Sequence, residues 1–156
     1  MHATVPVATQ PHPAPPPGDA DSARARAATY FRALDSLDAD EVASFFAPGA
    51  TVTLPRTPPI LGRAAIRKAL VQLSLAVDEL RHQPIQLWNS GSLSVYEADL
   101  TLMLPNRTQL SFPVTHIVRW VEGMIQEARV DVYLESRVAL AISAFDRLRQ
   151  SSLFQP

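Results

Sequence analysis

The chain has 156 residues, of which 47% are hydrophobic, and a formal net charge of -1 at pH 7, which suits one domain with a single core. This balance gives no electrostatic basis for binding nucleic acid or an anionic membrane. The chain contains no cysteine, which excludes disulfides, thiol nucleophiles and thiolate metal sites. Since it also lacks a long apolar run and the pattern of a secretory leader, we expect a cytoplasmic protein with no membrane contact.

The first 20 residues differ in composition from the rest of the chain. They hold six of the 14 prolines and show neither a helical nor a strand period. We therefore expect a disordered, proline-rich tail over residues 1–20 and one domain over residues 21–150. The run Pro15-Pro16-Pro17 offers either a polyproline ligand for an aromatic groove or part of a solubilising tail.

Helices dominate the first half of the predicted domain. The first is expected over residues 21–36, because apolar residues recur there at helical spacing: Tyr30, Phe31, Leu34 and Leu37. Asp38 and Glu41 form a capping box, in which the Asp38 carboxylate accepts from the amides of a second helix and Glu41 reaches back. That helix ends at residues 47–49, a strand follows over residues 50–54, and a third helix starts after Gly62.

Four strands and a helix follow. The strands are expected over residues 82–88, 93–104, 108–121 and 124–134, because turn residues separate them. Short connections imply an antiparallel meander. The last segment, ESRVALAISAFDRLRQ, is predicted to be an amphipathic helix, with one apolar stripe formed by Val138, Ala141, Ile142, Phe145 and Leu148. Helices first and a sheet afterwards give an α+β architecture.

Strand alternation sorts the side chains of the predicted sheet into rows. On the strand over residues 93–104, one row holds the carboxylates: Leu93, Val95, Glu97, Asp99, Thr101 and Met103. The opposite row is mostly apolar: Ser94, Tyr96, Ala98, Leu100, Leu102 and Leu104. The next strand has a row with one polar member, His116, among Phe112, Val114, Val118 and Trp120. Periodicity leaves open which row of each strand faces the core.

Two segments, ATYFRALDSLD at residues 28–38 and PPILGR at residues 58–63, resemble motifs of the nuclear transport factor 2-like superfamily. The resemblance is to its SnoaL-like and ketosteroid-isomerase-like members. It implies a cone-shaped, curved antiparallel sheet wrapped around three N-terminal helices, with a C-terminal helix added. It also implies one deep hydrophobic pocket for a small apolar molecule, no cofactor, and a homodimer formed through the outer face of the sheet.

The resemblance also implies catalytic residues. In ketosteroid isomerases, a Tyr on the first helix and a protonated Asp on the penultimate strand donate hydrogen bonds to the developing oxyanion. Tyr30 matches that Tyr, and His116 occupies the position of that Asp. The same register turns Glu97 and Asp99 inward, so that Asp99 would orient His116 as a general acid or base near neutral pH. The expected pocket lining is Leu54, Trp88, Thr101, Met103, Phe112, Val114, Val118 and Val130.

The chain departs from these families at important positions. Leu54 stands where ketosteroid isomerases carry their catalytic base, and Phe46 and Leu70 replace the supporting tyrosines. The acid/base Asp of the SnoaL-like polyketide cyclases falls nearest Val130, while Asp131 lies in the opposite phase. Neither family mechanism therefore transfers intact.

Two functions remain open. The first is an enzyme for isomerisation, cyclisation or dehydration of a polyketide-like or steroid-like substrate, using the set of Tyr30, Glu97, Asp99 and His116. The second is a non-catalytic ligand-binding or dimerisation module, in which His116 is only a satisfied buried residue, Glu97 and Asp99 pair with arginines, and Tyr30 belongs to the core. His82 is expected to be exposed, and no metal site is expected, because no HxH or HExxH spacing occurs.

Overall fold

The computed structural model describes residues 17–133, and the side chains of residues 21–133. Predictions for residues 1–16 and for the C-terminal helix lie outside this range. The elements follow one another in the order α1 (Pro17–Ser36), α2 (Ala39–Ser44), β1 (Phe46–Thr53), β2 (Ile60–Leu61), α3 (Arg63–Ala76), β3 (Glu79–Ser90), β4 (Leu93–Met103), β5 (Gln109–Val121) and β6 (Met124–Val132). Within the described residues the predicted order of helices and strands is confirmed, with the short strand β2 as an addition. Helix α1 begins at Pro17, within the segment predicted to be a tail.

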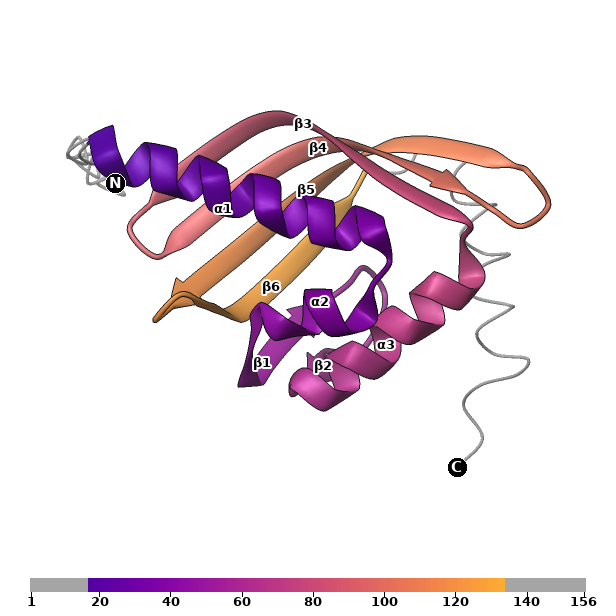
Figure 1. Ribbon diagram of the computed structural model, residues 1–156, viewed down its shortest axis with the longest axis horizontal. Coiled ribbons are helices and arrows are strands. Elements are labelled where there is room, and N and C mark those ends of the chain that lie inside the picture. The colour runs from indigo at the N-terminus through magenta and orange to yellow at the C-terminus, as the bar shows by residue number, and fades with distance from the viewer. Residues whose placement is uncertain (1–16, 134–156) are drawn as a thin grey trace, which may run out of the picture.

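The strands form one curved, open sheet in the order β2-β1-β6-β5-β4-β3 (Figure 1). Strands β3 to β6 are the expected antiparallel meander. The sheet is antiparallel, as expected, except at one pair, because β1 runs parallel to β6. These two strands are separated by the whole of α3 and the meander, and only such a long connection allows a parallel pairing.

The first strand begins earlier than its sequence suggests. It was expected at residue 50, but β1 begins at Phe46, which pairs with Ile125 of β6. The register then shifts before Thr51, so that Pro48 and Gly49 lie in an irregular part of the strand. An irregularity of this kind accommodates residues that a regular ladder excludes.

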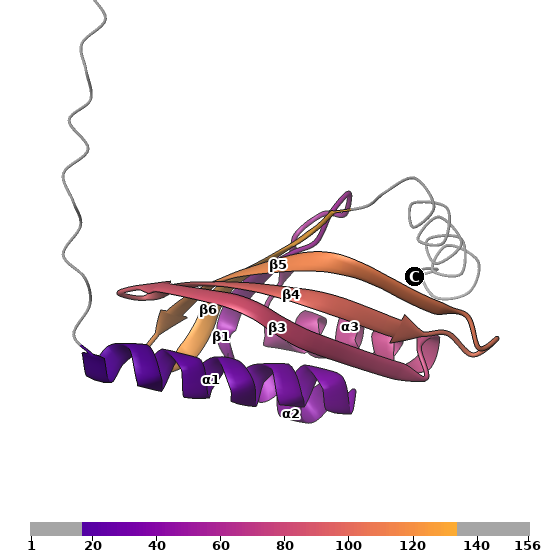
Figure 2. The same cartoon turned by 90° about the horizontal axis from the view of Figure 1, so that it is seen from above.

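The described helices cover one face of the sheet, as the view in Figure 2 shows. Helix α1 packs against β3, and α2 packs against α3. The core fills the space between this concave face and the helices. Its largest fully buried side chains on the strands are Tyr96, Val114, Val118 and Ile125.

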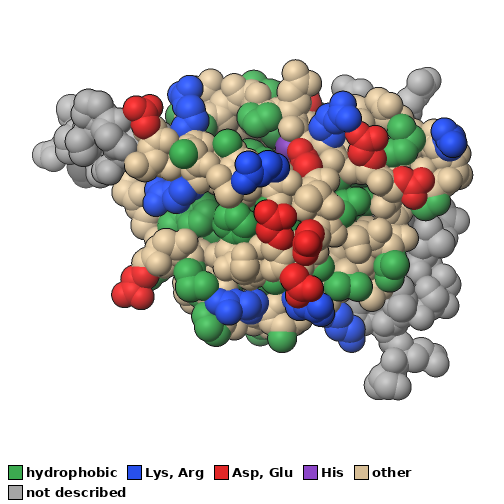
Figure 3. All heavy atoms as spheres, viewed as in Figure 1, with side chains coloured by type: hydrophobic (Ala, Val, Ile, Leu, Met, Phe, Trp, Pro, Cys, Tyr) green, Lys and Arg blue, Asp and Glu red, His purple; other side chains and the backbone are tan. Residues whose placement is uncertain are grey.

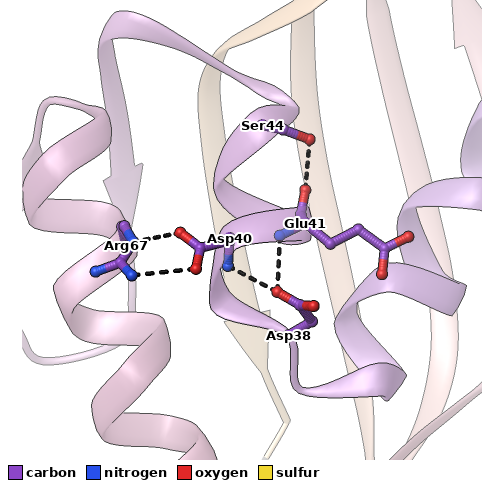
Figure 4. A network of polar contacts seen from close by, with 5 residues as sticks. All are labelled: Asp38, Asp40, Glu41, Ser44 and Arg67. Atoms are coloured by element: carbon purple, nitrogen blue, oxygen red, sulfur yellow. Dashed lines mark hydrogen bonds and ion pairs between the residues drawn. The ribbon is translucent and has the colours of Figure 1, made fainter.

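The cap predicted for the second helix is present at Asp38 (Figure 4). Its Oδ1 atom accepts from the backbone N–H groups of Asp40 and Glu41, at 2.9 Å each. The Glu41 carboxylate does not reach back to the cap amide but accepts from the Ser36 hydroxyl at 3.3 Å. Asp40 pairs with Arg67 of α3, whose hydrogen bond lowers the pKa of that carboxyl. The Asp40–Arg67 pair joins α2 to α3 at the surface.

Gly62 provides the predicted start of α3. Its φ of 85° lies in the region that favours glycine, and its N–H donates to the Ala50 carbonyl oxygen at 2.7 Å. Arg63 Nε donates to the Phe46 carbonyl oxygen at 2.6 Å. The Gly-Arg pair therefore joins the start of α3 to β1.

The face formed by the helices carries charges of both signs in mixed order (Figure 3). Such a surface offers no extended field of one sign. None of the helices within residues 17–133 is long and apolar enough to cross a membrane.

Candidate active site

Helix α1 brings an aromatic and an acidic side chain to the same place on the sheet. Phe31 and Asp35 are one helical turn apart, so both project from the same side of α1. Tyr30 and Phe31 are buried, at 3% and 4% exposure. Three side chains of the sheet face them: His82 on β3, Tyr96 on β4, and His116 on β5. Tyr96 and His116 are cross-strand partners.

The Asp35 carboxylate holds His82 by both backbone and ring. Its two oxygens accept from the His82 backbone N–H at 3.0 and 3.1 Å, and Oδ1 lies 2.7 Å from the ring Nδ1. A carboxylate beside Nδ1 favours the tautomer that carries its proton there, which leaves Nε2 of a neutral ring with a free lone pair. The side chain of His82 is 3% exposed and that of Asp35 is 27% exposed. Asp35 thus orients a buried imidazole from the rim of the core.

His116 lies next to this pair and is held neutral. Its ring centroid is 5.1 Å from that of His82. Burial, together with the neighbouring His82, lowers the pKa of His116 to about 3. Neither ring nitrogen has a hydrogen-bond partner among the described residues. A neutral imidazole therefore presents one donor and one acceptor, both unused, inside the core.

Tyr30 completes the polar cluster as a donor. Its ring lies edge-on to that of His116, with 6.3 Å between the centroids. Burial, and to a lesser extent Tyr96, raises the pKa of the Tyr30 hydroxyl well above its usual value. Tyr30 therefore keeps its proton, so it can donate a hydrogen bond to a neighbouring oxygen but does not act as a base.

Apolar rings fill the space around these groups. Phe31 stacks on His82 at 4.9 Å and meets His116 edge-on at 5.3 Å. Tyr96 accepts a hydrogen bond from Trp120 Nε1 at 3.3 Å.

A hollow of about 10 Å³ lies between α1, α2 and α3, and one of about 210 Å³ lies at Ile85 and Tyr133. The deep pocket implied by the resemblance stays a prediction.

The structure corrects the predicted orientation of the two carboxylates. Tyr96 pairs with His116 and Ala98 pairs with Val114, so these residues share the concave face. Glu97 and Asp99 consequently project from the opposite face, and Asp99 is exposed. The row of β4 with the greater apolar surface is the one that is buried, because burial of that surface drives folding.

Three predicted pocket residues are displaced by the same change of phase. Thr101 and Met103 follow Glu97 and Asp99 on the outer face. Trp88 pairs with Val95 on that face and is 48% exposed. None of the three contributes to the cluster around His116.

The other predicted lining residues are placed as expected. Phe112, Val114 and Val118 are buried on β5 with His116, and Val130 is the cross-strand partner of His116 on β6. Leu54 packs against the edge of the core. Their role in binding a ligand stays a prediction.

Sequence reasoning missed both members of the Asp35–His82 pair. Asp35 belongs to the ATYFRALDSLD segment, yet its role could be recognised only with its partner known. His82 was expected to be exposed, but it is buried, because β3 begins at Glu79 and places His82 in the inward phase with Leu80. The sequence signal for this burial was that His82 lies two residues after the apolar Leu80 and so shares its face of a strand.

The fold and the helix-covered, polar-centred core define a protein of the nuclear transport factor 2-like superfamily. The family model described as SnoaL-like domain matches residues 27–128, and the chain belongs to that family. A comparison with curated proteins gives no match.

Several solved structures share the fold. One is the epoxide hydrolase/cyclase-like enzyme SalBIII, with a role in pyran ring formation in the polyether salinomycin; it is 24% identical over 74% of this chain and 94% of its own, with a TM-score of 0.66. A putative SnoaL-like polyketide cyclase from Shewanella denitrificans OS-217 is 14% identical over 78% and 98%, with a TM-score of 0.69. A hypothetical protein with a ketosteroid isomerase-like fold from Catenulispora acidiphila DSM 44928, in complex with trimethylamine, is 15% identical over 73% and 89%, with a TM-score of 0.67.

Proposed function

We propose that the protein is a cofactor-independent acid/base enzyme that acts on a small, largely apolar molecule. The observation that carries this proposal is the 2.7 Å contact between Asp35 and His82 beside the unpartnered ring of His116. His82 takes the general-base role that the sequence assigned to His116, and Asp35 takes the orienting role of Asp99. Tyr30 keeps its role as a donor, and His116 becomes a second donor beside it.

His82 is the proton-transfer group in this proposal. Its Nε2 lone pair accepts a proton from the substrate, and the Asp35 carboxylate stabilises the imidazolium that forms. Asp35 also holds the backbone of His82, so the ring is fixed before substrate binds. Fixing a base in advance lowers the entropic part of the barrier.

Tyr30 and His116 stabilise the substrate oxygen. Both are uncharged donors in a buried setting, because burial keeps Tyr30 protonated and His116 neutral. Donors fixed in such a setting stabilise the charge that develops on an oxygen more strongly than water does. The two ring nitrogens of His116 have no partner among the described residues, and a substrate oxygen would accept a hydrogen bond from one of them.

The chemistry that fits this arrangement is removal of a proton from carbon next to a carbonyl group. His82 takes that proton while the carbonyl oxygen gains charge against Tyr30 and His116, giving an enol or enolate. Return of the proton at another carbon completes an isomerisation, and loss of a β-hydroxyl group as water completes a dehydration. The SnoaL-like family and its cyclase-like structural neighbours support this class of reaction.

A ligand-binding module without catalysis is the second candidate. Leu54 favours it, because an apolar residue stands at the position where ketosteroid isomerases carry their catalytic base. In this case the cluster binds the oxygen of a ligand and transfers no proton.

Exchange of substrate protons for deuterium tests the proposal without knowledge of the natural substrate. Cyclohexanone and 1-tetralone are incubated in D₂O with the protein, and the loss of the α-proton signals is followed by NMR. We expect the protein to accelerate exchange, and His82→Asn to slow it by about 10²–10⁴-fold, the usual scale for a lost general base. Asn preserves a donor toward Asp35 but has no basic nitrogen.

Asp78→Asn is the matched control, since Asp78 is exposed and does not belong to the cluster of Tyr30, Asp35, His82 and His116. Equal exchange rates for the parent protein and His82→Asn would refute the role of His82. Binding of the ketones without exchange would instead support the binding module.

A further inference from the structure

The outer face of the sheet carries apolar side chains that no described element covers. Ile85 is 58% exposed, Trp88 48% and Tyr133 65%. Trp88 pairs with Val95, and Val95 pairs with Ile117, so this surface continues across three strands. Contiguous apolar surface of this kind marks a site of interaction.

A hollow of about 210 Å³ opens on this face. It forms where the register of β3 against β4 shifts between Pro84 and Gln86, leaving Ile85 without a partner. Ile85, Pro113 and Tyr133 line its apolar part, and Glu97 and Thr115 line its polar part. The hollow therefore suits an apolar group that carries a cation or donor at its edge.

The charge of the face points to the same kind of occupant. Arg119 pairs with Glu127, and Arg129 pairs with Asp131. Glu97 and Asp99 project side by side from β4, and neither has an ion-pair partner among the described residues. Two neighbouring carboxylates favour a partner with positive charge.

We propose that residues 135–150 fold back as an amphipathic helix over this outer face. The segment follows directly on Tyr133, which already lies at the hollow and whose N–H donates to the Pro113 carbonyl oxygen at 3.2 Å. Its apolar stripe then covers Ile85, Trp88 and Ile117, and its arginines approach Glu97 and Asp99. This inference does not depend on the proposed function.

The sequence of the segment fits this surface in size and in charge. The stripe from Val138 to Leu148 extends about 15 Å along a helix, because the rise is about 1.5 Å per residue. Strands β3 to β6 span about 14 Å, because neighbouring strands lie about 4.8 Å apart. The segment carries three arginines and two carboxylates, an excess of one positive charge.

A second copy of the chain is the alternative occupant, and it is the dimer expected from the sequence. A symmetric pairing brings the same patch from both copies together. Where the two-fold axis of such a pairing passes near Glu97 and Asp99, the unpaired carboxylates of the two copies approach one another, which costs free energy. The tethered segment brings arginines instead.

Engineered cysteines distinguish these occupants, because the chain has no cysteine of its own. The full-length double variant Ile117→Cys with Ile142→Cys joins the centre of the outer face to the apolar stripe. Ile117→Cys with Ser143→Cys is the control, since Ser143 lies on the opposite side of the predicted helix. After oxidation, non-reducing electrophoresis and intact mass separate a disulfide within one chain from one between two chains.

We expect a disulfide within the chain for the Ile142→Cys pair and little for the Ser143→Cys pair. Adding Glu97→Gln and Asp99→Asn should slow formation of this disulfide by up to about fivefold. A factor of about five corresponds to the upper end of the stabilisation that an exposed ion pair provides. A disulfide between chains would show that a second copy covers the face. Equal yields from the two pairs, or no disulfide in either, would also overturn the proposal.

Discussion

Asp35 on α1 holds His82 on β3 by three contacts, two to the backbone N–H and one to the ring Nδ1. The two residues are 47 positions apart in the chain. The same carboxylate therefore joins the first helix to the sheet and sets the orientation of the imidazole.

Replacing Asp35 should affect stability and proton transfer together. In Asp35→Asn only one side-chain oxygen remains to accept from the His82 backbone and ring, so we expect a loss of about 1–3 kcal/mol in the free energy of unfolding. Urea denaturation measures this loss. Asp78→Asn, at an exposed position, should leave stability nearly unchanged. An equal effect of the two substitutions would contradict the anchoring role of Asp35.

His116 should make the protein less stable in acid. Its pKa is about 3 in the folded chain, against about 6.5 for an unperturbed imidazole. As the pH falls below 6.5, the unfolded chain binds a proton that the folded chain does not, so the free energy of unfolding decreases. The contribution of His116 to this slope is up to about 1.4 kcal/mol per pH unit.

His116→Phe removes this contribution of His116, and comparing the variant with the parent therefore measures it. Urea denaturation at several pH values between 7.5 and 4 should give a flatter profile for the variant than for the parent. The variant should also be more stable at pH 7.5 by about 1–3 kcal/mol, because it replaces unpartnered buried nitrogens with carbon. Parallel profiles would show that His116 is not held neutral in the folded protein.

Tyr30→Phe should separate catalysis from packing. The aromatic contacts with Phe45 and Phe46 are retained, so we expect the melting temperature to stay close to that of the parent. The rate of deuterium exchange should fall by about 10²–10³-fold, the scale for a lost oxyanion donor. NMR of the exchanging ketone measures the rate. Unchanged exchange would assign Tyr30 to the core alone.

The cap at Asp38 gives a test of the fold that is independent of the site. Asp38→Ala removes the acceptor for the N–H groups of Asp40 and Glu41, which should cost about 1 kcal/mol in the free energy of unfolding. Asp38→Ser retains an acceptor and should recover most of this loss. The free energies of unfolding of the parent, Asp38→Ala and Asp38→Ser are compared by urea denaturation. Equal values for all three would rule out a contribution from the cap.

Local patterns in the sequence predicted the elements well. The Asp38 cap, the start of α3 at Gly62 and the starts of β4, β5 and β6 depend on residues close together in the chain, and the structure has them near the expected positions. The inward row of β5 around His116 was predicted from the register that the family resemblance implies, because alternation alone left the choice of row open.

The contacts between distant elements were harder to predict. Alternation divides β4 into two rows but does not choose between them, and the choice decides whether Glu97 or Tyr96 meets His116. The register of β3 and the packing of α1 together bring Asp35 to His82, and neither follows from periodicity. The parallel pairing of β1 with β6 likewise depends on the assembled sheet.

The partial exposure of Asp35 gives the buried rings a connection to bulk water. Its side chain is 27% exposed, whereas that of His82 is 3% exposed. A proton on His82 Nδ1 can therefore exchange with bulk water by way of Asp35 while the interior stays covered. Solvent isotope thus reaches this nitrogen without any opening of the core, whereas the buried ring nitrogens of His116 have no such route among the described residues.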